Sequence, residues 1–514
     1  MGSSKTAAIL STFVAAAQAS SVLLSGGTVI AFDQASQSLN VVRDGSVLIE
    51  DDRIAGVYEK GTTIPAAKDN ATHEVVDCAG KIISPGFIDT HRHGWQTGFK
   101  TIASNTSLAE YFVRFGEFVA GDHLTADDVY IGQLAGLYEA LNAGTTTSLD
   151  HAHHTWSNAT SRAGLQASVD SGARVFWAYA FHNVTDFSVP EQIADFRGLM
   201  RDVPTKDTLV TPAMAYDSFY ANPYGQETRD VMALAREYNI SAMTAHYLGG
   251  PWATNNSPEL LHELGFLNDS IPVVFSHGSF MTEKDAELLH SCNQYLANTP
   301  ESEMHYGHSH EPSIHFGVQD QMALGVDTFF TYSTDMATQA RIWLQHARYA
   351  LYYDVLKQGA IPPNDPMSVN QAFLLATRAG GQALRRDDIG IIAPGAVADV
   401  LVYDGRSPSL LGWVDPVAAV VLHANAGDLE HVLVGGKFAK RDGKLTAANY
   451  AKVQDTLLES AARIQATWRE LPVPAMDTTF TTSGAPYVRA EEVNIMKGVA
   501  AAAAGNDGYG HKFD

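Results

Sequence analysis

Short apolar runs separated by glycine and polar residues mark both ends of the chain. Near the start, β-branched residues gather in such runs between residues 22 and 57, and the same pattern returns between residues 398 and 436. Runs of this length and spacing are typical of strands joined by tight turns. We therefore expect the two ends to pair into one small β-sandwich domain, formed by residues 21–84 and 389–445.

The periodicity changes in the middle of the chain. Apolar residues from Tyr130 to Leu141 recur at spacings of four, three and four, as on one face of a helix. This helix should begin after the cap residue Thr125 and end at Gly144, where a strand over residues 145–150 follows at once. A helix followed directly by a strand is a unit of an alternating α/β fold.

Further β-like runs follow, several of them separated by helix-like segments. They lie at residues 175–178, 209–211, 241–246, 272–277 and 328–335. Strands that alternate with helices over about 300 residues fit a (β/α)8 barrel, which typically needs about 250. A doubly wound sheet is the alternative, but the glycine fingerprint expected after its first strand is missing. The sequence thus predicts an α/β fold with a TIM-like barrel over residues 85–388 and a helix and tail over residues 446–514.

Polar side chains stand where the barrel strands are predicted to end, which is where the reactive groups of such barrels lie. His91 and His93 end the first run, and residues two apart on a strand face the same side. His246, His277 and Asp335 end later runs. Three imidazoles and one carboxylate suit Zn²⁺ or Fe²⁺ and leave a coordination position for water.

Each of these residues taken alone has a simpler explanation. An isolated His246 or His277 is more often a hydrogen-bonded interior histidine, and Asp335 could cap a helix beginning at Met336. Five such groups at the strand ends of one barrel favour a metal centre over five separate coincidences.

Two parts of the chain resemble the amidohydrolase superfamily, in its cytosine deaminase and chlorohydrolase-like branch. Residues 85–93, Pro-Gly-Phe-Ile-Asp-Thr-His-Arg-His, are similar to the signature of the family's first barrel strand. Residues 394–400, Pro-Gly-Ala-Val-Ala-Asp-Val, are similar to the segment that opens its returning β-sandwich, and residues 434–437 resemble the closing turn. The resemblance covers roughly residues 22–445 and implies the same barrel and β domain.

By this resemblance, His91, His93, His246 and Asp335 bind one divalent metal, most often zinc and alternatively iron. It also implies that His277 contacts the water on the metal or the substrate, and that Asp335 takes the proton from that water. The fourth β-like run has no lysine that could be carbamylated to bridge two metals, so we expect a single ion. The resemblance further implies a homodimer.

The chain departs from the family at one position that bears on the substrate. An acid usually stands three residues after the histidine of the fifth strand, but this chain has Gly249 there. Glu303 or His308 could supply the missing proton, and Glu303 is our candidate catalytic acid. His151 and His153, after the second β-like run, could line the pocket or hydrogen-bond behind it.

These observations predict a mononuclear metal-dependent hydrolase acting on a non-peptide carbon–nitrogen bond of a small cyclic or aromatic substrate. Deamination or dechlorination of an aromatic heterocycle is one alternative. A metal-dependent decarboxylase or lyase is another, because the same centre can polarise a ring that carries a carboxylate. The non-enzyme alternative is a barrel scaffold that has lost its metal, but all four candidate ligands are present.

Composition narrows the range of partners. The 514 residues are 45% hydrophobic, and 57 acidic against 34 basic side chains give a formal net charge of −23. Such an excess repels phosphate backbones and anionic lipids, so we expect a small-molecule substrate and neither nucleic acid nor a membrane as partner. Two cysteines, Cys78 and Cys292, are too few for a disulfide framework, although one bridge between them stays open.

The N-terminal segment has the pattern of a secretory signal peptide over residues 1–20. Lys5 precedes an apolar run over residues 6–17, and the small residues that follow suit signal peptidase. Chance predicts roughly three glycosylation sequons in such a chain. The chain has seven, at Asn70, Asn105, Asn158, Asn183, Asn239, Asn255 and Asn268. We expect a secreted glycoprotein, with a cytoplasmic protein as the alternative.

Overall fold

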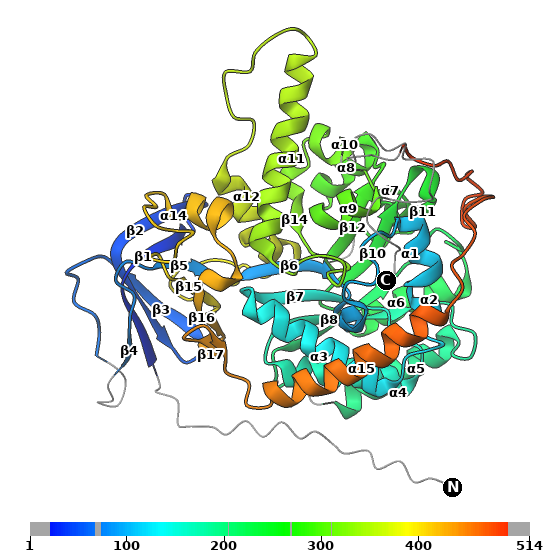
Figure 1. Cartoon of the computed structure of the whole chain (residues 1–514), viewed down its shortest axis with the longest axis horizontal. Helices are drawn as coiled ribbons and strands as arrows, with labels where there is room; N and C mark the ends of the chain where they lie inside the picture. The colour runs from blue at the N-terminus through cyan, green and yellow to red at the C-terminus, as the bar shows by residue number, and fades with distance from the viewer. Residues whose placement is uncertain (1–20, 67–72, 204, 268–269, 310, 492–514) are drawn as a thin grey trace, which may run out of the picture.

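The computed structural model describes residues 21–66, 73–203, 205–267, 270–309 and 311–491. Two sheets lie side by side in this part of the chain, a smaller β domain and a barrel surrounded by helices (Figure 1). The predicted signal peptide and the sequons at Asn70 and Asn268 fall outside the described residues.

The β domain is one sheet built from both ends of the chain. Its strands are β1 (Ser21–Asp33), β2 (Ser38–Glu50), β3 (Arg53–Tyr58), β4 (Glu74–Asp77), β5 (Ile82–Pro85), β15 (Val400–Tyr403), β16 (Leu429–Val434), β17 (Lys437–Arg441) and β18 (Lys444–Leu445). The order is β18-β17-β16-β15-β5-β1-β2-β3, with β4 beside β1. The two ends meet where β5 and β15 pair antiparallel. Pairing of the chain ends into one small β domain is therefore confirmed.

The second sheet is the barrel. Its strands are β6 (Phe87–Arg92), β7 (Thr145–Ala152), β8 (Arg174–Phe181), β9 (Val210–Tyr216), β10 (Met243–Leu248), β12 (Val273–Ser279), β13 (Tyr295–Asn298) and β14 (Met322–Leu324), and the short β11 (Thr254–Asn255) pairs with β10. Neighbouring barrel strands are parallel throughout. The predicted (β/α)8 barrel is confirmed.

Helices fill the connections between the strands. Around the barrel they are α1 (Leu108–Arg114), α2 (Glu117–Ala120), α3 (Ala126–Asn142), α4 (Asn158–Ser171), α5 (Val189–Asp202), α6 (Gln226–Glu237), α7 (Pro258–Glu263), α8 (Glu283–Ser291), α9 (Pro300–Tyr306), α10 (Glu311–His315), α11 (Met336–Leu356), α12 (Val369–Leu375) and α13 (Arg378–Ala383). The short turns η2 (Gly94–Phe99), η3 (Gly250–Trp252) and η4 (Gln319–Gln321) lie in the barrel loops. Beyond the barrel come α14 (Pro416–Ala418), η5 (Ala419–His423), η6 (Ala426–Asp428) and α15 (Tyr450–Glu470).

The helix predicted after Thr125 shows how local sequence sets these elements. The Thr125 hydroxyl accepts the backbone N–H of Asp128, and the Asp128 carboxylate accepts the backbone N–H of Thr125. This reciprocal cap satisfies two donors that a helix start leaves unpaired. The resulting α3 ends before Gly144, and β7 begins at the next residue, as the periodicity predicted.

The last two barrel strands differ from the prediction. The segment over residues 328–335 is a series of turns, and the final strand is the three-residue β14. The chain after β14 closes the barrel because Val326 and Asp327 both donate backbone N–H groups to the carbonyl of His91. A Cβ at Gly325 would lie 2.7 Å from the His91 backbone nitrogen, so only glycine allows this approach. Strands as short as β14 carry too little periodicity to be recognised from sequence.

The helix α15 runs outside the barrel and packs on the loop after β6. Trp468 is buried and donates its indole N–H to the carbonyl of Arg114. Ser460 hydrogen-bonds the carboxylate of Asp128 at 2.5 Å, which ties α15 to the start of α3. In Figure 1 this helix crosses in front of α3 and α4. The C-terminal helix therefore supports the loop that enters the mouth of the barrel.

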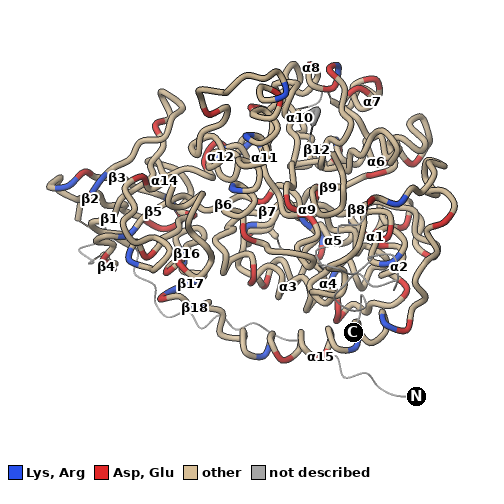
Figure 2. Tube along the Cα trace, turned by 45° about the horizontal axis from the view of Figure 1, so that its top comes forward, with Lys and Arg blue, Asp and Glu red and all other residues tan. Residues whose placement is uncertain are grey.

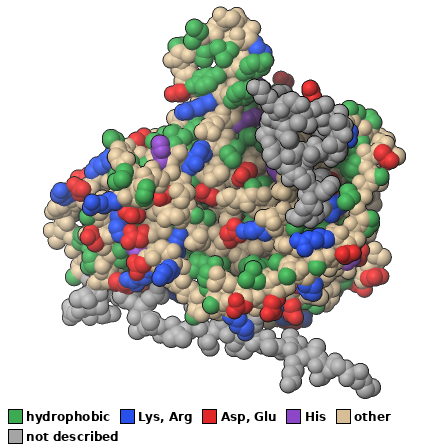
Figure 3. All heavy atoms as spheres, viewed as in Figure 1, with side chains coloured by type: hydrophobic (Ala, Val, Ile, Leu, Met, Phe, Trp, Pro, Cys, Tyr) green, Lys and Arg blue, Asp and Glu red, His purple; other side chains and the backbone are tan. Residues whose placement is uncertain are grey.

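The surface carries mixed charge and one projecting apolar end. Acidic and basic residues are interspersed along the trace (Figure 2). The C-terminal half of α11 projects from the barrel together with the loop that follows it, and hydrophobic side chains cover much of this end (Figure 3). No helix within the described ranges is both long enough and apolar enough to cross a bilayer. The two cysteines, Cys78 and Cys292, are both free.

Candidate metal centre

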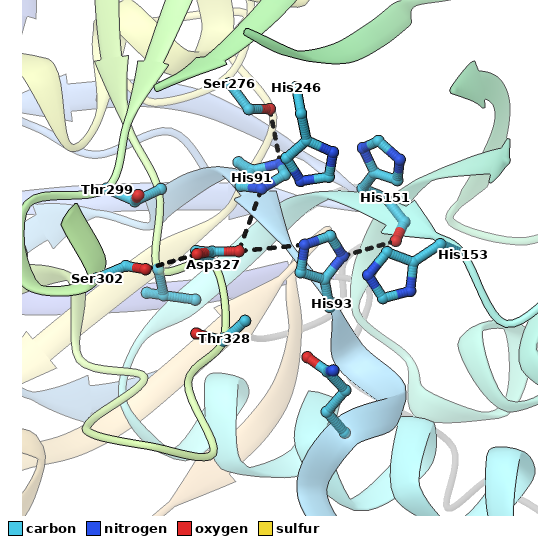
Figure 4. Close-up of polar contacts among 12 residues, drawn as sticks. His91, His93, His151, His153, His246, Ser276, Thr299, Ser302, Asp327 and Thr328 are labelled. Carbon is cyan, nitrogen blue, oxygen red and sulfur yellow. Dashed lines mark hydrogen bonds and ion pairs between the residues drawn. The ribbon is translucent and has the colours of Figure 1, made fainter. Parts of the chain in front are cut away.

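Four side chains meet at the C-terminal ends of the barrel strands. His91 and His93 come from β6, His246 from β10, and Asp327 from the segment after β14. One ligand atom from each lies within 4.8 Å of the others. Figure 4 shows the imidazoles of His91 and His93 turned toward the Asp327 carboxylate. The structure therefore brings together the three predicted histidines with an aspartate that the sequence did not identify.

The hydrogen bonds of His91 and His93 leave the same ring nitrogen facing the centre. Nδ1 of His91 lies 2.8 Å from the hydroxyl of Ser276, and Nδ1 of His93 lies 3.0 Å from the carbonyl of His151. Both Nε2 atoms then point at one carboxylate oxygen, Oδ1 of Asp327, at 3.3 Å and 3.1 Å (Figure 4). Hydrogen bonds that fix the distal nitrogen are what orient histidine ligands in metal sites.

The third histidine is held in the same way by Asp217, which follows β9. Nδ1 of His246 lies 2.8 Å from Oδ2 of Asp217, and the backbone N–H of His246 donates to Oδ1 at 2.7 Å. Burial alone would raise the pKa of Asp217, but the neighbouring His246 and His151 outweigh it and hold the pKa well below its ordinary value. Asp217 is thus an ionised acceptor that leaves Nε2 of His246 for the centre.

The four side chains fit a divalent cation. Nε2 of His91 is fully buried and makes no hydrogen bond within the described residues, although it lies 3.3 Å from Asp327. Such an orphaned buried nitrogen is costly unless another group satisfies it. Burial works to raise the pKa of Asp327, but the adjacent imidazoles of His91 and His93 and the charge of His277 hold it well below its ordinary value. Imidazole nitrogens with one ionised carboxylate are typical donors for zinc and related ions.

The prediction that Asp335 completes this group is corrected. Asp335 is the N-cap of α11, where its Oδ1 accepts the backbone N–H of Ala337 and its Oδ2 accepts the hydroxyl of Thr338. Its carboxylate therefore caps the helix, which is the simpler of the two roles that the sequence left open for this residue. The ligand position belongs to Asp327, because the strand before it ends at Leu324 rather than near residue 335.

His277 lies beside the four-residue group, as predicted. Its ring centroid is 5.2 Å from that of His91 and 5.7 Å from that of His246. Nδ1 of His277 lies 3.1 Å from Oε1 of Glu303 and 3.1 Å from the hydroxyl of Thr299. This leaves Nε2 as the nitrogen of His277 that can face the centre.

Glu303 lies behind His277 rather than beside the open space. It is on α9, its side chain has no exposed surface, and its Oε1 also accepts the backbone N–H of Thr299. Its Oε2 accepts the amide N–H of Asn298 at 2.8 Å. His308 completes a buried group with His277 and Glu303. Glu303 therefore acts on the centre through His277. This geometry does not support the predicted role of Glu303 as an acid that donates directly to the substrate.

Strand β7 and the segment directly after it bring two further histidines near the centre. His151 lies 3.2 Å from Asp217, and the ring of His153 stacks on that of His93 with centroids 3.9 Å apart. Burial lowers the pKa of His151 to about 4 and that of His153 well below its ordinary value. Both imidazoles are therefore neutral near pH 7.

Sequence reasoning missed two carboxylates of the centre. Asp327 had a usable signal, since a short apolar run and a glycine lead directly into it at residues 322–327. Asp217 follows β9 in the same way, but no spacing in the sequence indicates that it binds His246 across 29 residues. Side-chain contacts between neighbouring strands become visible only in the folded barrel.

Comparisons with known proteins agree with this fold. A 5-methylthioadenosine/S-adenosylhomocysteine deaminase from Thermococcus sibiricus is 26% identical over 432 residues, which cover 81% of this chain and 93% of that protein. An atrazine chlorohydrolase from Arthrobacter aurescens complexed with zinc superposes with a TM-score of 0.70 at 17% identity, over 86% of this chain and 100% of that one.

A third similar protein is an adenosine deaminase from Xanthomonas campestris with bound zinc. It superposes with a TM-score of 0.70 at 18% identity, over 87% of this chain and 98% of that one. The sequence pattern of the Amidohydrolase family matches residues 82–439, which include all of the barrel strands and the candidate ligands. The chain belongs to the Amidohydrolase family.

Proposed function

We propose that this protein is a metal-dependent hydrolase that cleaves a non-peptide carbon–nitrogen bond in a small heterocyclic molecule. The observation that carries the proposal is the meeting of Nε2 of His91 and Nε2 of His93 at Oδ1 of Asp327. His246 belongs to the same group of four, and His277 lies beside it. A bound cation would supply a Lewis acid that lowers the pKa of water and polarises the substrate.

The chain's own residues account for the proton movements that hydrolysis needs. Oδ1 of Asp327 is the base that accepts a proton from the attacking water, because Ser302 already occupies its Oδ2 at 2.5 Å. The same oxygen can return that proton to the departing nitrogen. Nε2 of His277 stabilises the oxygen that attacks, since Glu303 and Thr299 take its Nδ1. Because His91 and Asp327 are buried, bulk water is kept from competing with the attacking water.

We propose one zinc ion as the metal. The donor set of three imidazoles and one carboxylate supports zinc, and two solved structures with this fold are described with bound zinc. Metal analysis of the purified protein should return about one equivalent. Restoring activity to the chelated protein with zinc, iron or manganese in turn identifies the working ion.

The substrate class is tested with a panel of aminopurines and aminopyrimidines, lactams and acyclic amides. Deamination releases ammonia, whereas opening of a lactam yields an amino acid without free ammonia. Deamination of an adenine-type compound has the additional support that the Thermococcus sibiricus relative is named as a deaminase of such compounds. A metal-loaded protein that hydrolyses no member of the panel would contradict the proposal.

We further propose that the protein enters the secretory pathway and is N-glycosylated. The asparagines of the five sequons in the described ranges are all exposed. They are Asn105, Asn158, Asn183, Asn239 and Asn255. Treatment of protein from a eukaryotic secretory host with an amidase specific for N-glycans should lower its mass, and an unchanged mass would contradict the proposal.

We propose a homodimer, as the resemblance to the amidohydrolase superfamily implies. The projecting end of α11 and the loop after it support this, because Tyr349 and Tyr353 on the helix and Ile361 in the loop are 70%, 52% and 86% exposed. Sedimentation of the wild type should give twice the monomer mass, and Ile361→Glu should shift it toward the monomer.

A further inference from the structure

One carboxylate near the metal centre has an oxygen that no described residue uses. Glu117 begins α2, in the loop after β6, and its side chain is 16% exposed. Its Oε1 lies 2.9 Å from Nδ1 of His182. Its Oε2 lies 3.6 Å from Nε2 of His153, which is longer than a hydrogen bond, and makes none within the described ranges.

The other carboxylates of the centre are already engaged. Oδ1 of Asp327 faces the histidines while Ser302 holds Oδ2, and Glu303 is sealed behind His277. Both oxygens of Asp217 bind His246. Glu117 thus has a partly exposed side chain and an oxygen, Oε2, that makes no hydrogen bond among the described residues.

His182 fixes Glu117 in this position. Both of its ring nitrogens face acceptors, since Nδ1 lies 2.9 Å from Glu117 and Nε2 lies 3.2 Å from the carbonyl of Thr155. Donation to Oε1 from a buried ring anchors one oxygen, while Oε2 lies 3.6 Å from Nε2 of His153. The carboxylate is therefore preorganised rather than free to rotate into solvent.

The neighbouring His153 carries a hydrogen-bond donor beside that acceptor. The indole N–H of Trp95 donates to Nδ1 of His153 at 3.0 Å, and an indole nitrogen can only donate. Nδ1 is therefore unprotonated, and the ring proton of His153 is on Nε2. An acceptor at Oε2 and a donor at Nε2 stand 3.6 Å apart on the side of the His93 ring.

The pair lies close to the metal centre. The His153 ring stacks on His93, whose Nε2 faces Asp327. Burial raises the pKa of Tyr111 well above its ordinary value, and the charges of Asp327, Tyr306 and Glu117 add to this effect, so both carboxylates act on the same side chain. Glu117 and His153 therefore lie on the side of the centre where His153 stacks on His93.

We propose that Oε2 of Glu117 and Nε2 of His153 form the edge that recognises the substrate, by binding an N–H donor and an adjacent acceptor nitrogen or oxygen. This edge is complementary to an aminopyrimidine, an aminopurine or a lactam, and a carboxylate on the substrate would be repelled by Glu117. The inference rests on the proposed function and names the substrate class within it.

The test measures binding separately from turnover. Binding of 2-aminopyrimidine and of pyrimidine-2-carboxylate to the metal-loaded protein is followed by NMR titration. The wild type should prefer 2-aminopyrimidine, and Glu117→Gln should weaken its binding about tenfold, as loss of one charge-assisted hydrogen bond does. The variant should bind the carboxylate no worse than the wild type.

Two further variants keep the result specific. Asp122→Asn removes an exposed carboxylate from the same loop and should leave both affinities unchanged. Glu117→Asp keeps the charge but withdraws it by one methylene, so its 2-aminopyrimidine affinity should fall between those of the wild type and Glu117→Gln. With any substrate that is turned over, Glu117→Gln should raise KM more than it lowers kcat, with metal content unchanged.

The inference is overturned if Glu117→Gln and Asp122→Asn bind both probes alike, or if the wild type does not favour 2-aminopyrimidine. It is also overturned if Glu117→Gln lowers the affinity for both probes equally, because a purely structural role of Glu117 would have that effect. Failure of the proposed function is a different result, namely a wild type that discriminates the probes as expected and hydrolyses no carbon–nitrogen bond of the panel.

Discussion

The end of β14 and the start of α11 each carry an aspartate that is almost fully buried, and the two serve opposite purposes. Asp327 is 4% exposed and lies among three histidines, whereas Asp335 is 8% exposed and caps a helix. Burial raises the pKa of Asp335, while the histidines around Asp327 overcome burial and lower its pKa. The position of an aspartate after a barrel strand therefore does not by itself make it a metal ligand. The side chains around the aspartate decide this.

The largest expected difference is in metal binding and turnover. Asp327→Asn removes both the anionic ligand and the proposed base, so kcat should fall by about 10²–10⁴-fold and bound metal should be lost. Asp335→Asn keeps a capping acceptor for Ala337 and should retain metal and activity. Metal content and initial rates of the two variants, measured side by side, check this.

If Asp327→Asn kept its metal and turnover and Asp335→Asn lost both, Asp335 would be the metal ligand after all. Equal losses in both variants would mean that neither assignment is right. The pair is matched in side chain, in burial and in the substitution made, so a general effect of removing buried charge is controlled within the experiment.

Much of the fold could be predicted because its signals are local. Thr125 and Gly144 bound α3, and alternating strands and helices indicate the barrel. His91 and His93 could be placed because both lie on one strand two residues apart, where side-chain alternation decides their direction. His246 and His277 follow from strands β10 and β12, which are long enough to be recognised.

The remaining residues depend on contacts between distant segments. Asp327 follows a strand of only three residues, and its place beside His91 depends on the close approach allowed by Gly325. Asp217 reaches His246 from the segment after β9, and Glu117 approaches His153 from the start of α2. The absence of an acid at Gly249 could be read directly, but the structure adds that a Cβ there would meet the Ser279 carbonyl at 3.0 Å.

The next comparison concerns the carboxylates that support the centre. Glu303→Gln keeps the shape of the side chain but removes the charge that holds Nδ1 of His277. Supporting hydrogen bonds of this kind are worth up to about 100-fold in activity, so kcat should fall by that order while KM and metal content change little. Steady-state kinetics with metal analysis test this prediction.

Glu301 provides the matched control on the same helix. Its carboxylate accepts the amide of Gln339 instead of contacting His277, so Glu301→Gln should leave kcat within about twofold of the wild type. If the two variants lose activity equally, the effect belongs to the packing of α9 and not to His277.

A smaller effect is expected at Asp217. Asp217→Asn weakens the acceptor that orients His246, and the metal affinity should fall by about tenfold, within the usual range for such partners. Competition with a chelator measures the affinity. Asp230→Asn on the neighbouring α6 is the control, since the Asp230 carboxylate accepts from Gln226 and serves no histidine of the centre. Unchanged affinity in Asp217→Asn would remove Asp217 from the metal centre.

The smallest effect returns to the helix cap. Asp335→Ala removes acceptors for the backbone N–H of Ala337 and the hydroxyl of Thr338, which should cost about 1 kcal/mol of unfolding free energy. Asp335→Asn keeps an acceptor for Ala337 and should cost less. Urea unfolding of both variants measures these differences, with metal content and kcat as controls that should not move.

The pH dependence of the cap distinguishes the two aspartates once more. Because the pKa of Asp335 is raised from 3.8 in the folded protein, the unfolded chain loses this proton first as the pH rises. The wild type should therefore lose stability relative to Asp335→Asn as the pH rises from about 4 through the folded pKa, because Asn cannot ionise. Urea midpoints of the metal-free proteins at several pH values give this difference directly. A difference that is constant with pH, or that has the opposite sign, would mean that the folded protein favours the charged form of Asp335, as it does for Asp327.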